Sequence, residues 1–254
     1  MSSKCALVTG GVKRIGAAIS KRLMRSGFTV IAHYNRSEDS AVELANWAEQ
    51  HGFELKLAKF DLSDINNIAV FYERLRDDAG NIDVLVNNAS IFNYDNFYTM
   101  QPDVLMSTIE LNCLAPVLLM QKFLTRGQTE NAVCINILDQ KVVNLNPDFY
   151  SYTIAKAAFG VASKLAGMAI GRSLRVNSIS PGLTLTSGDQ SEENFNFAQS
   201  SNPLGRGPTA EAIADGVMFL IENKSINGYN LVIDAGEHLL ARTRDVAYVK
   251  NEDL

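Results

Sequence analysis

Three side chains in the second half of the chain have types and a spacing that suit acid–base chemistry. Tyr152 and Lys156 are four residues apart, which places both side chains on one face of a helix. A lysine ammonium beside a phenol can lower the pKa of the phenol from about 10, so that the tyrosine becomes a proton donor near neutral pH. Asp139, thirteen residues before Tyr152, adds a carboxyl group. We predict that these residues take part in catalysis.

The elements that must position these residues follow from an alternation of short apolar runs and longer helical patterns. Strand-like runs cover residues 5–8, 28–33, 54–59, 84–86, 133–137, 175–179 and 230–233. Helix-like stretches cover residues 15–26, 39–51, 64–79, 102–124, 150–170 and 210–222. The alternation predicts an α/β fold with one Rossmann-type, doubly wound parallel sheet of about seven strands and helices on both faces. Pro116 inside the stretch 102–124 predicts a kink.

Neither a repeat nor a linker divides the chain, so we predict one dinucleotide-binding and catalytic domain over residues 1–240. Residues 184–207 are rich in Ser, Asn, Gln and Gly, which is typical of a substrate lid or of a disordered stretch. Residues 241–254 are polar and charged, and we expect a mobile tail or a subunit contact there.

Composition argues against several classes of function. The net charge of −5 gives no indication of nucleic acid or of an anionic membrane as a partner. No apolar run approaches the roughly 18 residues of a membrane span. The first strand-like run begins at residue 5, which leaves no room for a signal peptide. We therefore expect a cytoplasmic protein with a small-molecule substrate.

A glycine-containing loop, residues 9–16, follows the first strand and opens the first helix. Gly10 and Gly16 would permit a tight turn and let backbone amides approach a pyrophosphate at the helix N-terminus, next to Ile15. Arg14 stands where such loops usually have their middle glycine. Its guanidinium could reach a phosphate or an electron-rich substrate, or it could be a surface helix residue.

The residues after the second strand indicate which nucleotide is bound. An NAD site would need an acidic residue there, but Asn35, Arg36 and Ser37 come first. Arg36 and Ser37 offer donors for a 2′-phosphate, so NADPH is the favoured cofactor, although Arg36 could also be a solvated surface residue. Asp61, after the third strand, could accept from the adenine amino group or could lie at a helix N-terminus.

Together these segments resemble the short-chain dehydrogenase/reductase family over about residues 4–240. Asn87-Asn-Ala-Ser90 is similar to the family's Asn-Asn-Ala-Gly, and Asn112 matches the helix asparagine that holds a water in the family's proton relay. Tyr152 and Lys156 match the catalytic pair, with Lys156 orienting the cofactor ribose. The resemblance implies that the cofactor is bound by Gly10, Arg14, Ile15, Gly16, Asn35, Arg36, Ser37, Asp61, Leu62, Asn88, Ala89, Ser90, Tyr152, Lys156, Pro181 and Gly182.

Departures from the family pattern point to one branch of it. Most members have serine where this chain has Asp139. The set of departures is similar to the pteridine reductases of trypanosomatids and to bacterial dihydromonapterin reductases, although Asn35 replaces a histidine of the trypanosomatid pattern. This resemblance implies that Phe92 stacks on a pterin and that Asp139 and Tyr152 protonate its ring nitrogens. The implied substrate-binding residues are Arg14, Ser90, Phe92, Asp139, Tyr152, Gly182 and Leu183.

The chemistry of a carboxyl group agrees with a pterin substrate. A carboxylate would repel the alkoxide that develops in ketone reduction, whereas a carboxyl group of raised pKa can give a proton to the nitrogen of a C=N bond. Burial would raise the pKa of Asp139 and Lys156 would oppose this. We predict NADPH-dependent reduction of a 7,8-dihydropterin (dihydromonapterin, dihydrobiopterin or dihydrofolate) to the tetrahydro form.

Other interpretations remain open at this point. The chain could be a carbonyl or quinone reductase, or a nucleotide-binding regulator without activity, and Phe92 could be a packed loop aromatic. The resemblance also implies a homotetramer assembled through the helices at 102–124 and 150–170.

Overall fold

Seven parallel strands form one sheet in the computed structural model, which describes residues 4–125, 132–170, 174–186 and 190–248. The strand order is β3-β2-β1-β4-β5-β6-β7. This confirms the predicted doubly wound parallel sheet. The strands are β1 Lys4–Val8, β2 Phe28–Tyr34, β3 Leu55–Lys59, β4 Val84–Asn87, β5 Ala132–Ile137, β6 Leu174–Pro181 and β7 Asn230–Ile233.

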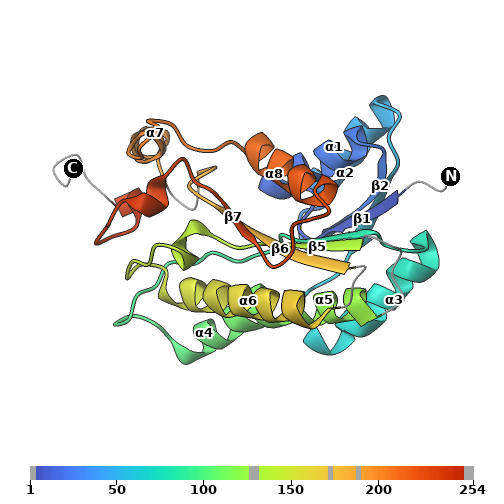
Figure 1. Cartoon of the computed structure of the whole chain (residues 1–254), viewed down its shortest axis with the longest axis horizontal. Coiled ribbons are helices and arrows are strands. Elements are labelled where there is room, and N and C mark those ends of the chain that lie inside the picture. Colours follow the sequence, from blue (N-terminus) through green and yellow to red (C-terminus); the bar gives the residue numbers. More distant parts are fainter. Residues whose placement is uncertain (1–3, 126–131, 171–173, 187–189, 249–254) are drawn as a thin grey trace.

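Helices cover both faces of the sheet and create two apolar cores (Figure 1). One layer contains α1 Arg14–Arg25, α2 Glu38–Gln50 and α8 Ala210–Glu222, and the other contains α3 Ile68–Ala79, α5 Ala115–Thr125 and α6 Tyr150–Ala169. Because successive strand residues point to opposite faces, Ala6 and Val8 enter the first core while Cys5 and Leu7 enter the second.

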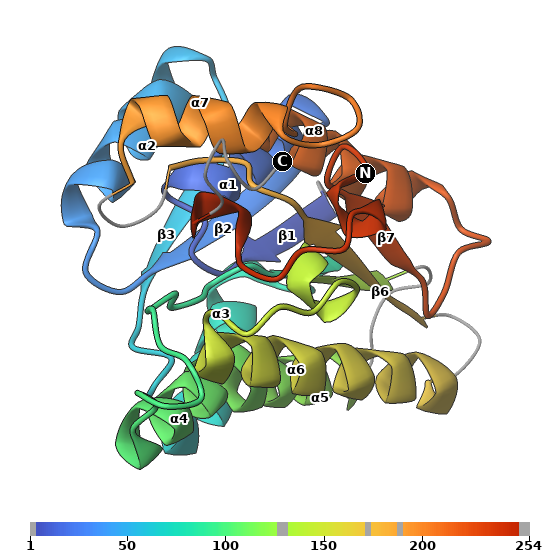
Figure 2. The same ribbon diagram turned by 90° about the vertical axis from the view of Figure 1, so that its left-hand side faces the viewer.

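The strand order changes direction between β1 and β4. This point of the sheet determines where a ligand can bind. These two strands pair directly, with Val8 opposite Val86. The chain leaves them toward opposite halves of the sheet, which opens a crevice beyond their carboxyl ends. Short 3₁₀ turns near this edge include η3 Gln140–Val142, η4 Glu237–Leu239 and η5 Val246–Tyr248, and Figure 2 shows the last of these close to α7 Glu192–Ser200.

The interruption predicted from Pro116 takes the form of a π-helical turn, Glu110–Leu114, between α4 Pro102–Ile109 and α5. Pro116 has no N–H, and its ring would clash with the carbonyl of Asn112 in a regular helix. A wider turn relieves both conflicts, and turns of this kind are frequent at functional sites.

The same helical stretch bears on the membrane prediction. Within the described residues, Pro102–Thr125 is the one segment long and apolar enough to cross a membrane, and a third of its most apolar window is buried. Leu119, Met120 and Phe123 belong to the second core, which accounts for the apolar composition of α5.

The segment after residue 240 differs from a free tail over the part that the structure describes. Arg244 donates to Asp148 from Nε at 2.7 Å and from Nη2 at 2.9 Å, and Val246 is buried. Arg242 donates to the carbonyl of Ser201, directly after α7. Residues 241–248 therefore pack back onto the body of the fold, while the rest of the predicted tail lies outside the described residues.

The helix that carries Tyr152 is capped by a distant side chain. Phe149 precedes α6 with φ 56° and provides no side-chain cap. Asp95, from the loop after β4, accepts from the backbone N–H of Ser151 at 3.0 Å and from the Ser151 hydroxyl. Asp95 thus performs the function of an N-cap residue and ties the loop to the helix.

We predict that Asp95→Ala lowers the free energy of unfolding by about 1–3 kcal/mol, because it leaves two buried donors of Ser151 without an acceptor. Denaturant unfolding measures the effect. Asp95→Asn retains one acceptor and should recover part of the loss. Asp103→Ala, which removes an exposed carboxylate from the first turn of α4, is the matched control and should change stability much less. Equal effects of Asp95→Ala and Asp103→Ala would contradict the capping interpretation.

Candidate active site

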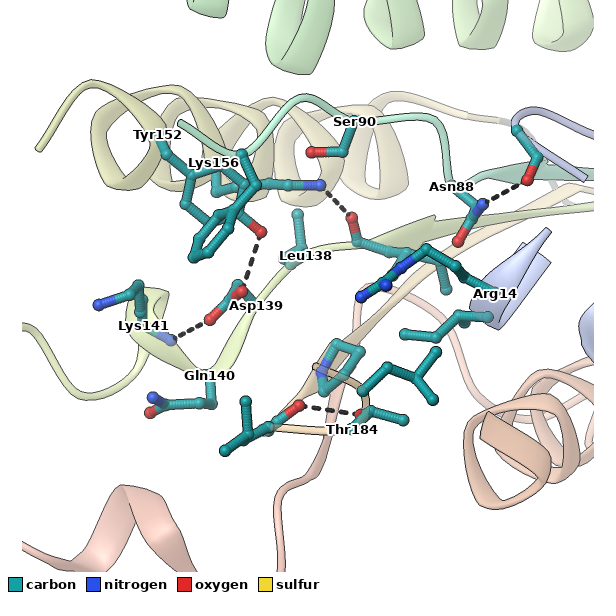
Figure 3. Close-up of a pocket in the computed structure, with 18 of the residues that line it drawn as sticks. Arg14, Asn88, Ser90, Leu138, Asp139, Gln140, Lys141, Tyr152, Lys156 and Thr184 are labelled. Atoms are coloured by element: carbon teal, nitrogen blue, oxygen red, sulfur yellow. Dashed lines mark hydrogen bonds between the residues drawn. The ribbon is translucent and has the colours of Figure 1, made fainter. Parts of the chain in front are cut away.

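A cavity of about 440 Å³ lies at the carboxyl edge of the sheet (Figure 3). Its walls come from the loops after β1, β4, β5 and β6 and from α6. Most of the residues predicted for the cofactor and substrate meet there. They are Gly10, Arg14, Ile15, Gly16, Asn88, Ala89, Ser90, Phe92, Asp139, Tyr152, Lys156, Pro181, Gly182 and Leu183.

Two predicted groups lie outside the cavity lining. Asn35, Arg36 and Ser37 follow β2, and Asp61 and Leu62 follow β3, farther along the same edge of the sheet. Arg36 is exposed, so its guanidinium is accessible to a ligand. The Asp61 carboxylate accepts from the N–H and the hydroxyl of Ser63, and these hydrogen bonds lower its pKa. Asp61 therefore stabilises a local turn whether or not it also contacts adenine.

The glycine-containing loop is tightly built against the first helix. A Cβ atom on Gly16 would lie 2.0 Å from the carbonyl oxygen of Gly10, so only glycine allows this approach. Gly10 itself has φ 59°. No side chain caps α1 and its first turn contains no acidic residue. The N-terminal amides of α1 and their positive dipole end consequently remain available to an anion.

Arg14 occupies a strained position at the entrance of the cavity. Its φ of 54° is one that glycine adopts at little cost and other residues rarely adopt. Its Nη2 donates to the carbonyl of Thr186 at 2.8 Å, so it connects the glycine loop to the predicted lid. Arg14 is exposed rather than packed, in agreement with a side chain that contacts ligands.

A buried histidine supports the same loop, a contact that sequence reasoning did not predict. Nδ1 of His33 accepts from the N–H of Gly10 at 3.1 Å, while Nε2 lies 3.0 Å from the carbonyl of Phe60. These contacts fix a neutral imidazole that donates from Nε2. Burial lowers the pKa of His33 from 6.5 to about 4, which keeps it neutral. The sequence pattern of β2 does not indicate this contact, because it joins β2 to the loop after β1.

The three predicted catalytic side chains are brought together (Figure 3). The Tyr152 hydroxyl donates to Asp139 Oδ2 at 2.8 Å, and the backbone N–H of Lys141 donates to Asp139 Oδ1 at 2.9 Å. Nζ of Lys156 donates to the carbonyl of Ile137, another lining residue, at 2.8 Å. Tyr152 and Lys156 are both buried. A connected acid–base pair therefore faces the cavity, with an ammonium behind it.

Burial dominates the electrostatics of this group. It raises the pKa of Asp139 above its usual range, against the lowering effects of the Lys141 N–H and ammonium. Burial and the neighbouring Asp139 raise the pKa of Tyr152 well above 10, and burial lowers the pKa of Lys156 to about 8. The expected lowering of the tyrosine pKa by Lys156 is thus wrong. Asp139 is the stronger acid of the pair.

Asn112 is not among the lining residues, and both the oxygen and the nitrogen of its amide are hydrogen-bonded. Its Oδ1 accepts from the N–H of Ile91 at 2.9 Å and its Nδ2 donates to the carbonyl of Ile91 at 2.8 Å. The Ser90 hydroxyl donates to the same Oδ1 at 3.2 Å. Asn112, held by the π-helical turn, therefore fixes the loop that carries Ser90 and Phe92. Its predicted water-holding function stays a prediction.

Phe92 stacks on Phe149 with ring centroids 4.0 Å apart and meets Tyr152 edge to face at 4.6 Å. It is 38% exposed, so part of its ring is available to a ligand. This arrangement agrees with both predicted interpretations, because Phe92 packs against the loop and also faces the cavity.

Several lining residues were absent from the sequence prediction. Asp245, Val246 and Ala247 belong to the C-terminal segment, which contains no motif. Lys141 was within reach of sequence reasoning because it lies two residues after Asp139. The others are Lys13, Ile137, Leu138, Gln140, Thr184 and Leu185.

Comparison with known proteins identifies the family. A family model described as enoyl-(acyl carrier protein) reductase matches residues 11–238. The 3-oxoacyl-[acyl-carrier-protein] reductase FabG of Vibrio harveyi is 30% identical, over 94% of this chain and 99% of the relative. The chain belongs to the short-chain dehydrogenase/reductase family. It is an oxidoreductase.

Solved structures of this family agree with the fold and share one type of cofactor. FolM alternative dihydrofolate reductase 1 from Brucella suis, in complex with NADP, is 34% identical with a TM-score of 0.89, over 95% of this chain and 98% of that one. A short-chain dehydrogenase from Burkholderia cenocepacia, also in complex with NADP, is 28% identical with a TM-score of 0.86, over 92% and 97%. NADP is the cofactor type predicted from Arg36 and Ser37.

The low pKa of His33 predicts how the stability of this short-chain dehydrogenase/reductase depends on pH. The unfolded chain binds a proton near pH 6.5, whereas folded His33 resists protonation until about pH 4. The contribution of neutral His33 to the free energy of unfolding is therefore fully present above pH 6.5. This contribution is lost as the pH falls toward 4, and the loss amounts to about 3 kcal/mol at most. Denaturant unfolding over this range should show the loss in the native protein and a smaller slope in His33→Asn. His51→Asn, at an exposed imidazole, is the matched control, and parallel curves for His33→Asn and the native protein would refute the assignment.

Proposed function

We propose that this oxidoreductase reduces a 7,8-dihydropterin (dihydromonapterin, dihydrobiopterin or dihydrofolate) to the tetrahydro form with NADPH. The hydrogen bond between Tyr152 and Asp139, 2.8 Å long and at the wall of the cavity, carries the proposal. Asp139 provides a carboxyl group at the position where most family members have a serine hydroxyl. The likeness to an alternative dihydrofolate reductase of Brucella suis supports the same substrate class.

The residues present suit NADPH. The uncapped amides of α1 and the glycine approach at Gly16 form a cradle for phosphate groups. Arg36 and Ser37, beyond β2, would contact the 2′-phosphate, and Lys156 would hold the ribose next to the nicotinamide. When bound, NADPH supplies the hydride that reduces the substrate carbon.

Proton delivery is the task of Asp139 and Tyr152. Burial keeps a proton on Asp139 at higher pH than usual, so the neutral carboxyl group can donate to a ring nitrogen. Tyr152, hydrogen-bonded to Asp139, passes protons between the carboxyl group and the substrate side of the cavity. Reduction of a ketone would instead place negative charge on oxygen beside Asp139. An ionised Asp139 repels that charge, whereas the serine of most family members is a neutral donor at every pH.

The cavity also suits a flat heterocycle. Phe92 presents part of its ring to the cavity and would stack on the pterin, opposite the nicotinamide. Arg14 would contact the pterin edge and a cofactor phosphate. Residues 184–207 would form the lid, tied to Arg14 through Thr186.

A second candidate function is reduction of a carbonyl or quinone. Relatives favour it, because carbonyl reductase family member 4 of Xenopus laevis is 28% identical over 94% of this chain and 99% of the relative. Asp139 distinguishes the two candidates, since it suits protonation of nitrogen better than stabilisation of an alkoxide.

The test compares NADPH oxidation with 7,8-dihydromonapterin, dihydrobiopterin, dihydrofolate and a simple ketone. We expect turnover of at least one dihydropterin above that of the ketone. Asp139→Asn should lower dihydropterin turnover by about 100-fold or more, which is the scale of general acid catalysis, because an amide cannot release the proton.

Asp139→Ser is the informative companion variant, because it restores the family's usual donor. We expect it to lose dihydropterin turnover and to gain or retain ketone turnover. Ketone turnover above all dihydropterins in the native protein, or undiminished dihydropterin turnover in Asp139→Asn, would favour the carbonyl reductase instead.

We further propose a cytoplasmic homotetramer assembled through α4, α5 and α6. Exposed apolar side chains on α4 and α6 support it, namely Met106, Ile154, Val161, Leu165 and Met168. Sedimentation at micromolar concentration should give a tetramer, and Val161→Glu together with Leu165→Glu should dissociate it. A native protein that sediments as a monomer would refute the assembly.

A further inference from the structure

A buried ion pair next to Asp139 has no function in the reaction described above. Nζ of Lys141 lies 2.6 Å from Asp245 Oδ2, with side-chain exposures of 3% and 11%. The same ammonium donates to Asn146 Oδ1 at 2.8 Å. Both partners line the cavity, although more than a hundred residues separate them along the chain. Burying two charges is costly, so a pair at this position invites a functional explanation.

Lys141 is joined to Asp139 by two routes. Its backbone N–H donates to Asp139 Oδ1, and its ammonium acts on the same carboxyl group through space, where it favours the ionised form. An ionised carboxylate has no proton to give. Asp245 acts in the opposite direction, because its negative charge favours the protonated form of Asp139.

Charged and titratable groups from several elements face Asp139. Tyr152 and Lys156 come from α6, Lys141 from η3, and Glu237 from η4, while Asp245 comes from the C-terminal segment. Burial raises the pKa of Glu237 to about 7, and Arg242 opposes this rise. Lys141 and Asp245 form the closer of the two ion pairs here, at 2.6 Å, since Nε of Arg242 lies 3.9 Å from Oε1 of Glu237.

We propose that Lys141 and Asp245 are positioning residues for the reaction: the Asp245 carboxylate neutralises the Lys141 ammonium, and Asp139 thereby keeps the proton that it delivers to the substrate. The Lys141 N–H can then hold the Asp139 carboxyl group in place without its side chain ionising that group. This inference rests on the proposed function, because it concerns the acid used in that reaction.

The C-terminal segment is anchored so that Asp245 reaches Lys141. The buried carboxylate of Asp148 accepts two hydrogen bonds from the Arg244 guanidinium and one from the N–H of Asp245 at 2.8 Å. Oδ1 of Asp245 accepts from the N–H of Ala247 at 3.0 Å, which fixes the rotation of the carboxylate. The contact is therefore held from both sides.

The experiment follows the protonation of Asp139 directly, by infrared spectroscopy of its carboxyl band over pH in the full chain with NADP⁺. The band is assigned by its absence in Asp139→Asn. We expect Asp245→Asn to move the titration midpoint of Asp139 to lower pH by about one pH unit and Lys141→Met to move it to higher pH by a similar amount. The double variant should return close to the native midpoint.

Arg244→Gln tests the anchor, because it weakens the hold on Asp148 but retains both charges of the ion pair. It should move the midpoint in the same direction as Asp245→Asn and by a smaller amount. The alkaline fall of kcat/KM with the best dihydropterin should shift in the same directions as the infrared midpoint.

Shifts of equal sign in Asp245→Asn and Lys141→Met, unchanged midpoints in both, or an Arg244→Gln shift opposite in sign to that of Asp245→Asn would overturn the proposal. These readings need no turnover. If no dihydropterin is reduced, the proposed function is refuted. The infrared measurement would still test the proposed effect of the ion pair on the protonation of Asp139.

Discussion

The site depends on the divergence of the chain at β1 and β4, which opens the carboxyl edge of the sheet. Thr9 locks these strands together there, because its hydroxyl oxygen accepts from the N–H groups of Asn88 at 2.9 Å and Ala89 at 3.0 Å. The glycine loop and the Ser90 loop are consequently held at a fixed separation. Asp139 and Pro181, at the ends of β5 and β6, complete the same edge.

Burial at this edge pushes the acid–base group toward its neutral forms. A carboxyl group, a phenol and an amine that are buried together each lose solvation when charged. The pKa values of Asp139 and Tyr152 rise, and that of Lys156 falls to about 8. Burial therefore keeps protons on Asp139 and Tyr152, which suits a reaction that adds a proton to nitrogen.

Sequence reasoning succeeded where a local pattern determines the structure. The strands were recognisable as short apolar runs, and the order of the glycine loop, Asn87-Asn-Ala-Ser90 and the Tyr152–Lys156 pair sufficed to place most of the cavity lining. It failed where contacts span the chain. Asp245 reaches Lys141 only because the C-terminal segment folds back onto the cavity. The hydrophobic pattern of the sequence does not predict this contact. Sequence reasoning also failed for the tyrosine pKa, which depends on burial and not on spacing.

The unusual residues of the cavity form one charge arrangement rather than separate substitutions. Arg14 tolerates a left-handed backbone that costs about 1–2 kcal/mol, and its guanidinium places positive charge at the entrance. Asp139 and Asp245 place carboxyl groups deeper, with Lys141 between them. A ketone offers a single acceptor and gains little from such a set. A pterin presents donors and acceptors around a flat ring, so it can use the cation, the acid and the aromatic face of Phe92 at the same time.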